Sequence, residues 1–108
     1  MDKVKLAIIY YSATGINYQL AKMAEEGGIE AGAEVRVLKV PELIPEEVIN
    51  KNPAMKANAD ATKDVPIATG DDLVWADAII FSVPTRFGNL ASQMKNFIDM
   101  QGGPWAEG

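Results

Sequence analysis

A short polar segment near the start of the chain has the residue types of an anion-binding loop. It reads Ser12-Ala13-Thr14-Gly15-Ile16-Asn17 and lies between an apolar run that ends at Tyr11 and a helical pattern. Because the first turn of a helix has unpaired N–H groups and the positive end of the helix dipole, this junction could hold a phosphate without any lysine or arginine. An alternative is equally open at this point, since Ser12, Thr14 and Asn17 are also ordinary capping and turn residues.

A second candidate segment follows another apolar run, and a tryptophan stands near the end of the chain. The segment Pro84-Thr85-Arg86-Phe87-Gly88 comes directly after residues 76–83. By itself it is compatible with a turn that has one surface arginine. Trp105, within Gly102-Gly103-Pro104-Trp105, is compatible with simple core packing, as for most tryptophans.

Composition excludes several kinds of catalysis. The 108 residues include no cysteine and no histidine, so the chain has no thiolate nucleophile, imidazole base or disulfide. The first loop lacks the Gly-Lys-Ser/Thr of a Walker A motif, and Gly15 stands alone rather than in a dinucleotide-binding glycine pattern. The side chains of this sequence therefore offer few groups for catalysis.

Charge and hydropathy indicate a small soluble domain. The net charge of −5 and the scattered basic residues argue against nucleic acid or an anionic membrane as the main partner. The apolar runs are far too short to cross a bilayer, and the N-terminus lacks the pattern of a signal peptide. We therefore expect one cytoplasmic domain with a modest core and no membrane insertion.

Period and length predict alternating strands and helices in the first part of the chain. Residues 4–10 predict a strand buried on both faces, and residues 34–40 predict a second strand. Between them a helix is expected to begin at Ile16 and to end near Gly32, with Gly28 weakening it by about 1 kcal/mol relative to alanine. The residues expected on its core face are Ile16, Leu20, Met23, Gly27 and Ala31.

The strand and helix periodicity ends at Pro41 and is absent up to Trp75, where only residues 46–50 and 71–75 predict short helices. A connection this long in a small α/β domain is typical of a functional segment, an insertion or disorder. Residues 76–83 then predict a third buried strand. A helix is expected after this strand, with Asn89 as its N-cap, and residues 102–105 cannot continue it. The residues expected on its apolar face are Leu90, Met94, Phe97 and Ile98.

These elements predict a flavodoxin-like α/β fold. Right-handed crossovers between the three strands give a parallel sheet with helices on both faces. If the first strand is central, the second and third lie on either side of it, and a ligand binds outside the carboxyl ends of the strands, between the first and third. Both candidate loops, residues 12–17 and 84–88, lie at that point.

In their order along the chain, the motifs resemble those of the WrbA-type NAD(P)H:quinone oxidoreductases, which are flavodoxin-like FMN enzymes. The most specific are Pro84-Thr85-Arg86-Phe87-Gly88-Asn89 and the later Gly102-Gly103-Pro104-Trp105. The long connection after Pro41 is also a feature of that family. The resemblance covers essentially all 108 residues and includes Tyr10-Tyr11-Ser12, Ala33-Glu34-Val35, Val65-Pro66, Ala68-Thr69, Gln93-Met94 and Phe97-Ile98-Asp99.

The resemblance implies FMN as the cofactor and gives a role to each loop. The loop that binds the FMN phosphate is matched by Ser12, Ala13, Thr14, Gly15, Ile16 and Asn17. The loop that lines the isoalloxazine ring is matched by Pro84, Thr85, Arg86 and Phe87, where Arg86 either adds positive charge near the reduced flavin or points to solvent. The substrate side of the flavin is matched by Thr14 and Trp105. The resemblance identifies no catalytic acid or base and no metal ligand.

The implied reaction is hydride transfer from NADH or NADPH to flavin N5, followed by two-electron reduction of a quinone in the same pocket. Because the cofactor performs this chemistry, a chain without cysteine or histidine can still be an enzyme. The alternative is a non-catalytic FMN-binding or electron-carrier module, or an incomplete fragment that needs a partner to fold. The resemblance also implies a homo-oligomer, a tetramer in the family.

The family continues well beyond the last residue of this sequence, with further strands and a third FMN loop. We therefore expect residues 1–108 to form the N-terminal part of a flavodoxin-like FMN-binding domain, truncated after the third strand and its helix. The apolar strand residues 78–81 would then lie at a sheet edge, which invites pairing with another chain. The chain is expected to be part of a larger protein or to complete its sheet by association.

Overall fold

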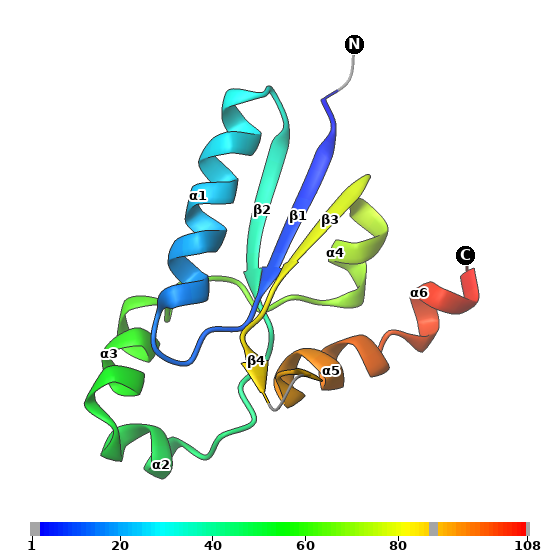
Figure 1. Cartoon of the computed structure of the whole chain (residues 1–108). Helices are drawn as coiled ribbons and strands as arrows, with labels where there is room; N and C mark the ends of the chain where they lie inside the picture. The colour runs from blue at the N-terminus through cyan, green and yellow to red at the C-terminus, as the bar shows by residue number, and fades with distance from the viewer. Residues whose placement is uncertain (1–2, 87–88, 108) are drawn as a thin grey trace.

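The structure is a computed structural model that describes residues 3–86 and 89–107. Its main sheet has three parallel strands in the order β2-β1-β3, and a short antiparallel pair, β4-β5, follows it (Figure 1). The elements in chain order are β1 (Lys5–Tyr10), α1 (Ile16–Glu30), β2 (Glu34–Lys39), α2 (Glu46–Lys51), α3 (Pro53–Ala61), α4 (Gly70–Trp75), β3 (Ala78–Ser82), β4 (Thr85–Arg86), β5 (Asn89–Leu90), α5 (Ser92–Asp99) and α6 (Gly102–Glu107). The predicted flavodoxin-like fold class and the central position of the first strand are confirmed.

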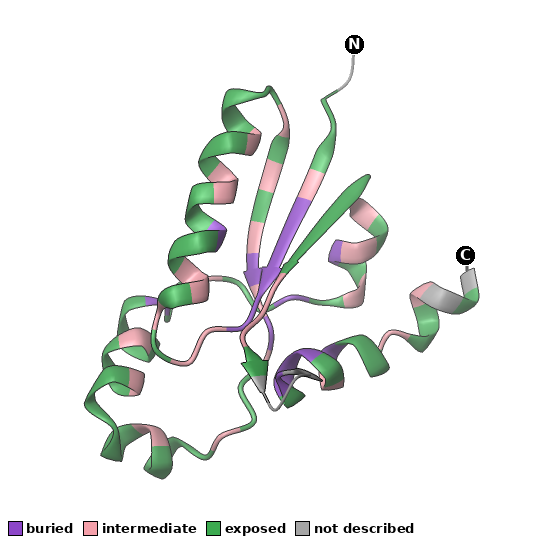
Figure 2. Ribbon diagram, viewed as in Figure 1, coloured by how far each residue is buried: buried purple, intermediate pink, exposed green. Residues whose placement is uncertain are grey.

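The central strand β1 is covered on both faces, as its uniform apolar pattern predicts. Ile8 and Tyr10 pack with Ala21 of α1 on one face. The alternate residues Ala7 and Ile9 pack on the other face with residues of α4 and α5. Figure 2 shows the resulting buried band along β1 at the centre of the molecule. Helices therefore cover both faces of the sheet, because successive side chains of a strand point to opposite faces.

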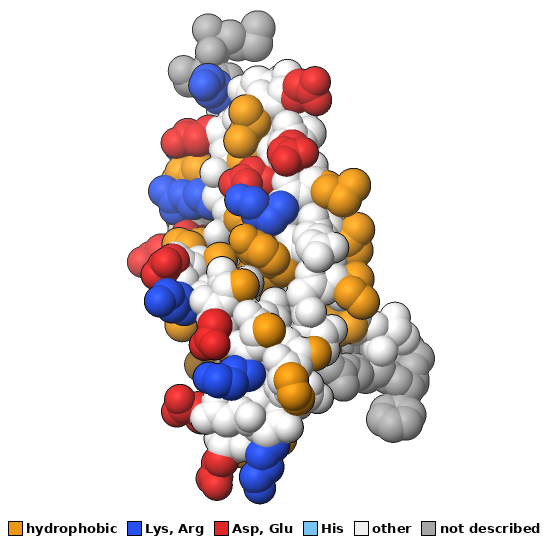
Figure 3. All heavy atoms as spheres, turned by 90° about the vertical axis from the view of Figure 1, so that its left-hand side faces the viewer, with side chains coloured by type: hydrophobic (Ala, Val, Ile, Leu, Met, Phe, Trp, Pro, Cys, Tyr) orange, Lys and Arg blue, Asp and Glu red, His pale blue; other side chains and the backbone are white. Residues whose placement is uncertain are grey.

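The buried face of α1 differs from the one that the sequence predicts. Ile16, Leu20 and Met23 are 68%, 52% and 65% exposed, and Figure 3 shows apolar side chains among charged ones on this side of the molecule. The sheet instead meets small residues, among them Ala21 and Gly28. A Cβ at Gly28 would lie 2.9 Å from Val35 Cγ2, so the glycine allows a close approach of helix and sheet. The prediction of the core face of α1 was wrong, because the helix lies so close to the sheet that small residues face it and larger apolar side chains remain outside.

The long connection between β2 and β3 contains a helix that the sequence reading missed. Helix α3 begins with Pro53 at its first position, and the Asn52 side chain accepts hydrogen bonds from the N–H groups of Ala54 and Met55. The predicted short helices are confirmed as α2 and α4. The connection therefore has its own helical structure beside the carboxyl end of the sheet (Figure 1).

The helix after β3 starts later than predicted, and Asn89 does not cap it. Asn89 and Leu90 form β5, and α5 begins at Ser92 with Ala91 in the cap position. Met94 and Phe97 face the core as predicted, whereas Ile98 is largely exposed. The N-cap prediction was wrong because the residues before α5 pair with β4 instead. The segment that cannot continue α5 forms the separate helix α6.

Strand β3 lies at the edge of the sheet and is largely exposed. Ile79, Ile80 and Phe81 are 39%, 41% and 44% exposed (Figure 2). The expectation of a third buried strand was therefore wrong within this chain, and the expectation of an apolar sheet edge is confirmed. The cause is the strand order, since β3 pairs only with β1 among the described residues.

An unpaired apolar edge predicts association of the 108-residue chain. Light scattering over a range of concentrations should give a mass above that of the monomer. Ile80→Lys should shift the chain toward the monomer, because a charge on an edge strand opposes pairing with another strand. Val74→Lys, at an exposed position of α4, is the matched control and should leave the mass unchanged. A monomeric parent chain with a cooperative melt would show that the edge does not need a partner.

Candidate functional site

The loop after β1 is shaped by a glycine and a serine. Gly15 has a φ of 108°, a left-handed conformation that non-glycine residues rarely adopt, and it stands at the N-cap of α1. Its N–H donates a 2.9 Å hydrogen bond to Ser12 Oγ, which closes the turn. Ser12 and Ala13 are half-buried, whereas Thr14 is exposed. The sequence therefore folds this loop tightly and leaves the Thr14 side chain accessible.

The first turn of α1 has no side-chain cap. Gly15, the N-cap residue, has no side chain that could accept a capping hydrogen bond, and the first turn has no acidic side chain. Of the three polar residues that could have been caps, Ser12 binds the N–H of Gly15 and Asn17 accepts from Ser82 instead. Because the first N–H groups of a helix have no intrahelical partner, this end of α1 can accept an anion.

The two candidate loops leave the sheet from neighbouring strands. Tyr10 pairs with Ser82, and the N–H of Tyr11 donates to the Ser82 carbonyl at 3.0 Å. Beyond the sheet, Ser82 Oγ donates to Asn17 Oδ1 at 2.9 Å. This bond ties the end of β3 to the first turn of α1. The structure therefore brings residues 12–17 and the start of residues 83–86 together where the strand order reverses.

The other sequence-predicted residues are placed as follows. Pro84 follows β3, and Thr85 and Arg86 form β4. Phe87 lies outside the residues that the structure describes. Trp105 is in α6, which lies against α4, where a Cβ at Gly70 would be 3.2 Å from Pro104 Cγ. Figure 1 shows α6 on the opposite side of the molecule from the loop after β1, so the structure does not bring Trp105 to that loop.

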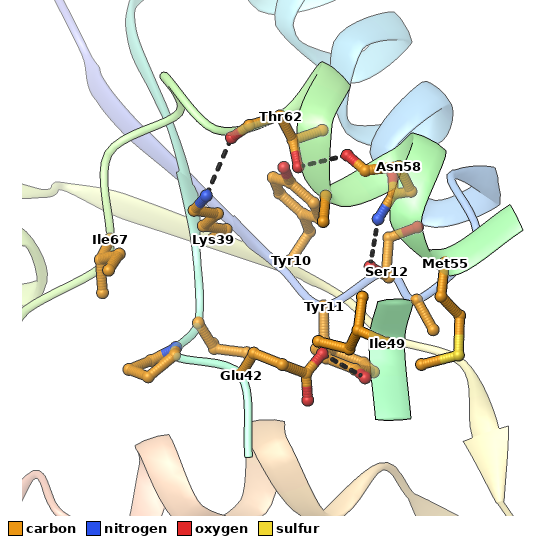
Figure 4. A pocket seen from close by; sticks show the side chains of 14 residues that line it. Tyr10, Tyr11, Ser12, Lys39, Glu42, Ile49, Met55, Asn58, Thr62 and Ile67 are labelled. Carbon is orange, nitrogen blue, oxygen red and sulfur yellow. Dashed lines mark hydrogen bonds between the residues drawn. The ribbon is translucent and has the colours of Figure 1, made fainter. Parts of the chain in front are cut away.

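Asn58 of α3 is a loop contact that the sequence reading missed. Its Nδ2 donates to the Ser12 carbonyl at 2.8 Å (Figure 4), and its Oδ1 would lie 3.4 Å from a Cβ at Gly15. The helical turn that contains Asn58 is itself held in place by two hydrogen bonds. Thr62 Oγ1 donates to the Asn58 carbonyl and Lys39 Nζ donates to the Thr62 carbonyl, both at 2.8 Å. No local pattern signals these contacts, since Asn58 and Ser12 are 46 residues apart.

A second polar cluster fixes the start of the long connection. Tyr11 Oη donates to Glu42 Oε2 at 2.7 Å, and Gln93 Nε2 donates to Glu42 Oε1 at 2.7 Å. The same Glu42 Oε1 accepts from the N–H groups of Leu43 and Ile44. Glu42 thus connects α5 and its own loop to Tyr11, the residue between β1 and Ser12.

The fold and the comparisons agree on the class of protein. Parallel strands in the order β2-β1-β3 with helices on both faces define a flavodoxin-like α/β protein. Residues 4–107 match the family of NADPH-dependent FMN reductases, and the chain belongs to that family.

The curated relatives are named NAD(P)H dehydrogenase (quinone). The chain is 58% identical over 105 residues to such a protein of Deinococcus radiodurans, covering 97% of this chain and 52% of the relative. It is 50% identical over 105 residues to proteins of the same name from Brucella abortus and Brucella melitensis, covering 97% of this chain and 50% of each relative. The chain therefore spans about half the length of the curated relatives it matches.

No helix in residues 3–86 or 89–107 has the length and apolarity needed to cross a membrane. The same residues contain no group of three or more acidic, histidine or cysteine side chains arranged to hold a metal ion.

The contact between Asn58 and Ser12 predicts that α3 stabilises the loop. In Asn58→Ala, loss of this hydrogen bond should lower the free energy of unfolding by about 1 kcal/mol. It should also speed hydrogen exchange at the Gly15 amide, measured by NMR, because the turn closed by Ser12 becomes freer to open. Asn50→Ala, at an exposed position of α2, is the matched control. Equal exchange at Gly15 in the two variants would show that α3 does not hold the loop.

Proposed function

We propose that this chain holds the FMN phosphate site of a WrbA-type NAD(P)H:quinone oxidoreductase. The observation that supports this most strongly is the uncapped N-terminus of α1 at the point where the strand order reverses. Membership of the FMN reductase family supports the FMN phosphate as the anion. The proposal covers residues 1–108 as the N-terminal part of a flavodoxin-like FMN-binding domain.

The loop residues fit a phosphate in chemistry and in shape. A phosphate needs several N–H or O–H donors and a close approach of the backbone. The open first turn of α1 offers N–H groups, Ser12 and Thr14 offer hydroxyls, and Gly15 has no side chain in the way. In this proposal the phosphate is held by Ser12, Ala13, Thr14, Gly15, Ile16 and Asn17.

The isoalloxazine ring is assigned to the loop after β3. This loop starts beside the first one, since Ser82 binds both Tyr11 and Asn17. Backbone groups of Pro84 and Thr85 would meet the polar edge of the ring, and the charge of Arg86 would stabilise the reduced flavin. The full set proposed for the ring is Pro84, Thr85, Arg86 and Phe87, and the set proposed for substrates is Thr14 and Trp105.

In the proposed mechanism the chemistry is that of the cofactor. Bound FMN supplies hydride acceptance from NADH or NADPH and two-electron delivery to a quinone. The part of this chain is to bind the phosphate, to fix the ring between the ends of β1 and β3 and to leave one ring face open to alternating substrates. We assign no side chain as a catalytic acid or base. The proposal also includes a homo-oligomer, a tetramer as in the family, in the cytoplasm.

Acidic substitutions in the loop test the phosphate assignment. Two like charges about 4 Å apart near a protein surface repel by about 4 kcal/mol, so Ser12→Glu and Thr14→Glu should each weaken FMN binding by at least about 100-fold. Titration with quenching of flavin fluorescence measures this affinity. Asn50→Glu adds the same charge at an exposed position of α2 and should leave the affinity nearly unchanged. Equal affinity of all three variants would contradict the assignment.

Turnover separates the proposed enzyme from a non-catalytic flavin module. In the proposed enzyme, the FMN-loaded chain oxidises NADH or NADPH with benzoquinone as the acceptor. Flavin quenching without turnover would favour the binding or electron-carrier alternative for these 108 residues. Absence of quenching in the parent chain would contradict both flavin functions for these residues.

A further inference from the structure

Tyr11 is bonded to the chain on both sides of the short strands β4 and β5. Its N–H donates to the carbonyl of Ser82, the last residue of β3, at 3.0 Å. Its Oη accepts a hydrogen bond from Nε2 of Gln93, in the first turn of α5, also at 3.0 Å. Since β4 and β5 lie between Ser82 and Gln93, the residue before the proposed phosphate loop holds the chain before β4 and the chain after β5.

The hydrogen bonds around Tyr11 Oη allow one arrangement of donors. An ionised carboxylate only accepts, so the Tyr11 hydroxyl donates to Glu42 Oε2, at 2.7 Å (Figure 4). The same hydroxyl is then free to accept from Gln93 Nε2, whose second N–H donates to Glu42 Oε1 at 2.7 Å. The Ser92 hydroxyl donates to the Gln93 side-chain carbonyl at 3.3 Å. All polar groups of the Gln93 amide are therefore used, which fixes its orientation.

Tyr11 and Gln93 meet in a buried environment. Their exposed fractions are 3% and 6%. The Tyr11 ring packs in the same apolar cluster as Met94 and Phe97 of α5. Apolar contact holds α5 against the sheet but has no preferred direction, whereas a buried hydrogen bond has a defined distance and angle. The bond from Gln93 to Tyr11 therefore determines where α5 begins relative to the end of β1.

The proposed cofactor has to reach both loops at once. Its phosphate is assigned to residues 12–17 and its ring to the loop after β3. A ligand that binds through two linked parts gains affinity only where the two partner surfaces stand at the separation that the ligand spans. A site whose supporting contacts leave it about 1 Å too loose loses much of that gain. Ser82 sets this separation at the start of the loop after β3, and Gln93 sets it beyond β5.

We propose that Gln93 is a positioning residue for the flavin. Through Tyr11 and Glu42, it holds the loop after β3 at the distance from the phosphate loop that FMN spans. Gln93 is assigned no contact with the cofactor. The inference rests on the proposed function, because it assumes that FMN contacts both loops. Loss of the bond between Gln93 and Tyr11 should therefore weaken the binding of whole FMN but not the binding of its two parts alone.

Two variants that keep the size of the side chain test this difference. Gln93→Met removes both N–H donors, and Tyr11→Phe removes the hydroxyl. Flavin fluorescence measures the affinities for FMN and riboflavin, and the amide shift of Gly15 in ¹⁵N-labelled protein measures that for inorganic phosphate. Each variant should bind FMN about tenfold more weakly, with changes below about twofold for riboflavin and phosphate. The double variant should bind FMN about as weakly as either single one, because both remove the same bond.

Gln101→Met is the matched control. It makes the same chemical change beyond the other end of α5, where Gln101 donates to the Phe97 carbonyl at 2.8 Å. This variant should lower the melting temperature and leave all three affinities unchanged. An unchanged FMN affinity in Gln93→Met would overturn the positioning role. An equal loss of affinity for FMN, riboflavin and phosphate would also overturn it, because the loops themselves would then be distorted.

Hydrogen exchange tests the same bond without a ligand. Relative to Gln101→Met, Gln93→Met should speed exchange at the Gly15 and Thr85 amides by about tenfold, because both loops open more often. The Ile8 amide, in the central strand, should exchange alike in the two variants. Equal exchange at Gly15 and Thr85 would overturn the inference. A parent chain that binds no FMN would contradict the proposed function, and the exchange rates would then decide alone whether Gln93 holds the two loops.

Discussion

The site depends on how β1 is held at its carboxyl end. The Tyr10 carbonyl accepts from the N–H of Val40 on the β2 side, and the N–H of Tyr11 donates to the Ser82 carbonyl on the β3 side, both at 3.0 Å. The strand is thus paired on both edges and packed on both faces up to the residue before Ser12. A loop that starts from such a fixed point can present Gly15 and the first turn of α1 in one geometry. That rigidity suits a site whose donors are backbone groups.

The long connection after β2 serves as a support for that loop. It returns to the sheet at Ile67, which bridges to Lys39, and Lys39 Nζ also binds the last turn of α3 at Thr62. From α3, Asn58 reaches the Ser12 carbonyl. Loops of this length are uncommon in small domains unless they have a function or a structure of their own. Here the connection has both helices and specific contacts, so its removal would leave one side of the loop without support.

The sequence predicts those features that depend on local pattern. Strand β1, the start of α1 at Ile16 and the left-handed Gly32 after its last turn follow from periodicity, length and residue type. The buried face of α1 does not follow from local pattern. Ala21 and Gly28 face the sheet because the helix approaches it closely, while larger apolar residues of the helix are exposed. The contact of Asn58 with Ser12 was also beyond prediction, since it depends on the tertiary return of α3. In α3 itself, Asn52 followed by Pro53 was a helix-start signal that could have been read.

The start of α1 has no side-chain cap, as is also the case for α2 and α5, whereas α3 and α4 are capped. Helix α3 is capped by Asn52, and in α4 the Asp72 carboxylate accepts from the N–H of Thr69. A glycine at the N-cap lowers helix stability by only about a few tenths of a kcal/mol relative to serine, threonine, asparagine or aspartate. Gly15 accepts this loss, although Ser12 and Asn17 are close enough in sequence to have served as caps and bind elsewhere instead. An anion at this end would supply the missing acceptor, so we infer that ligand binding and the stability of α1 are thermodynamically linked.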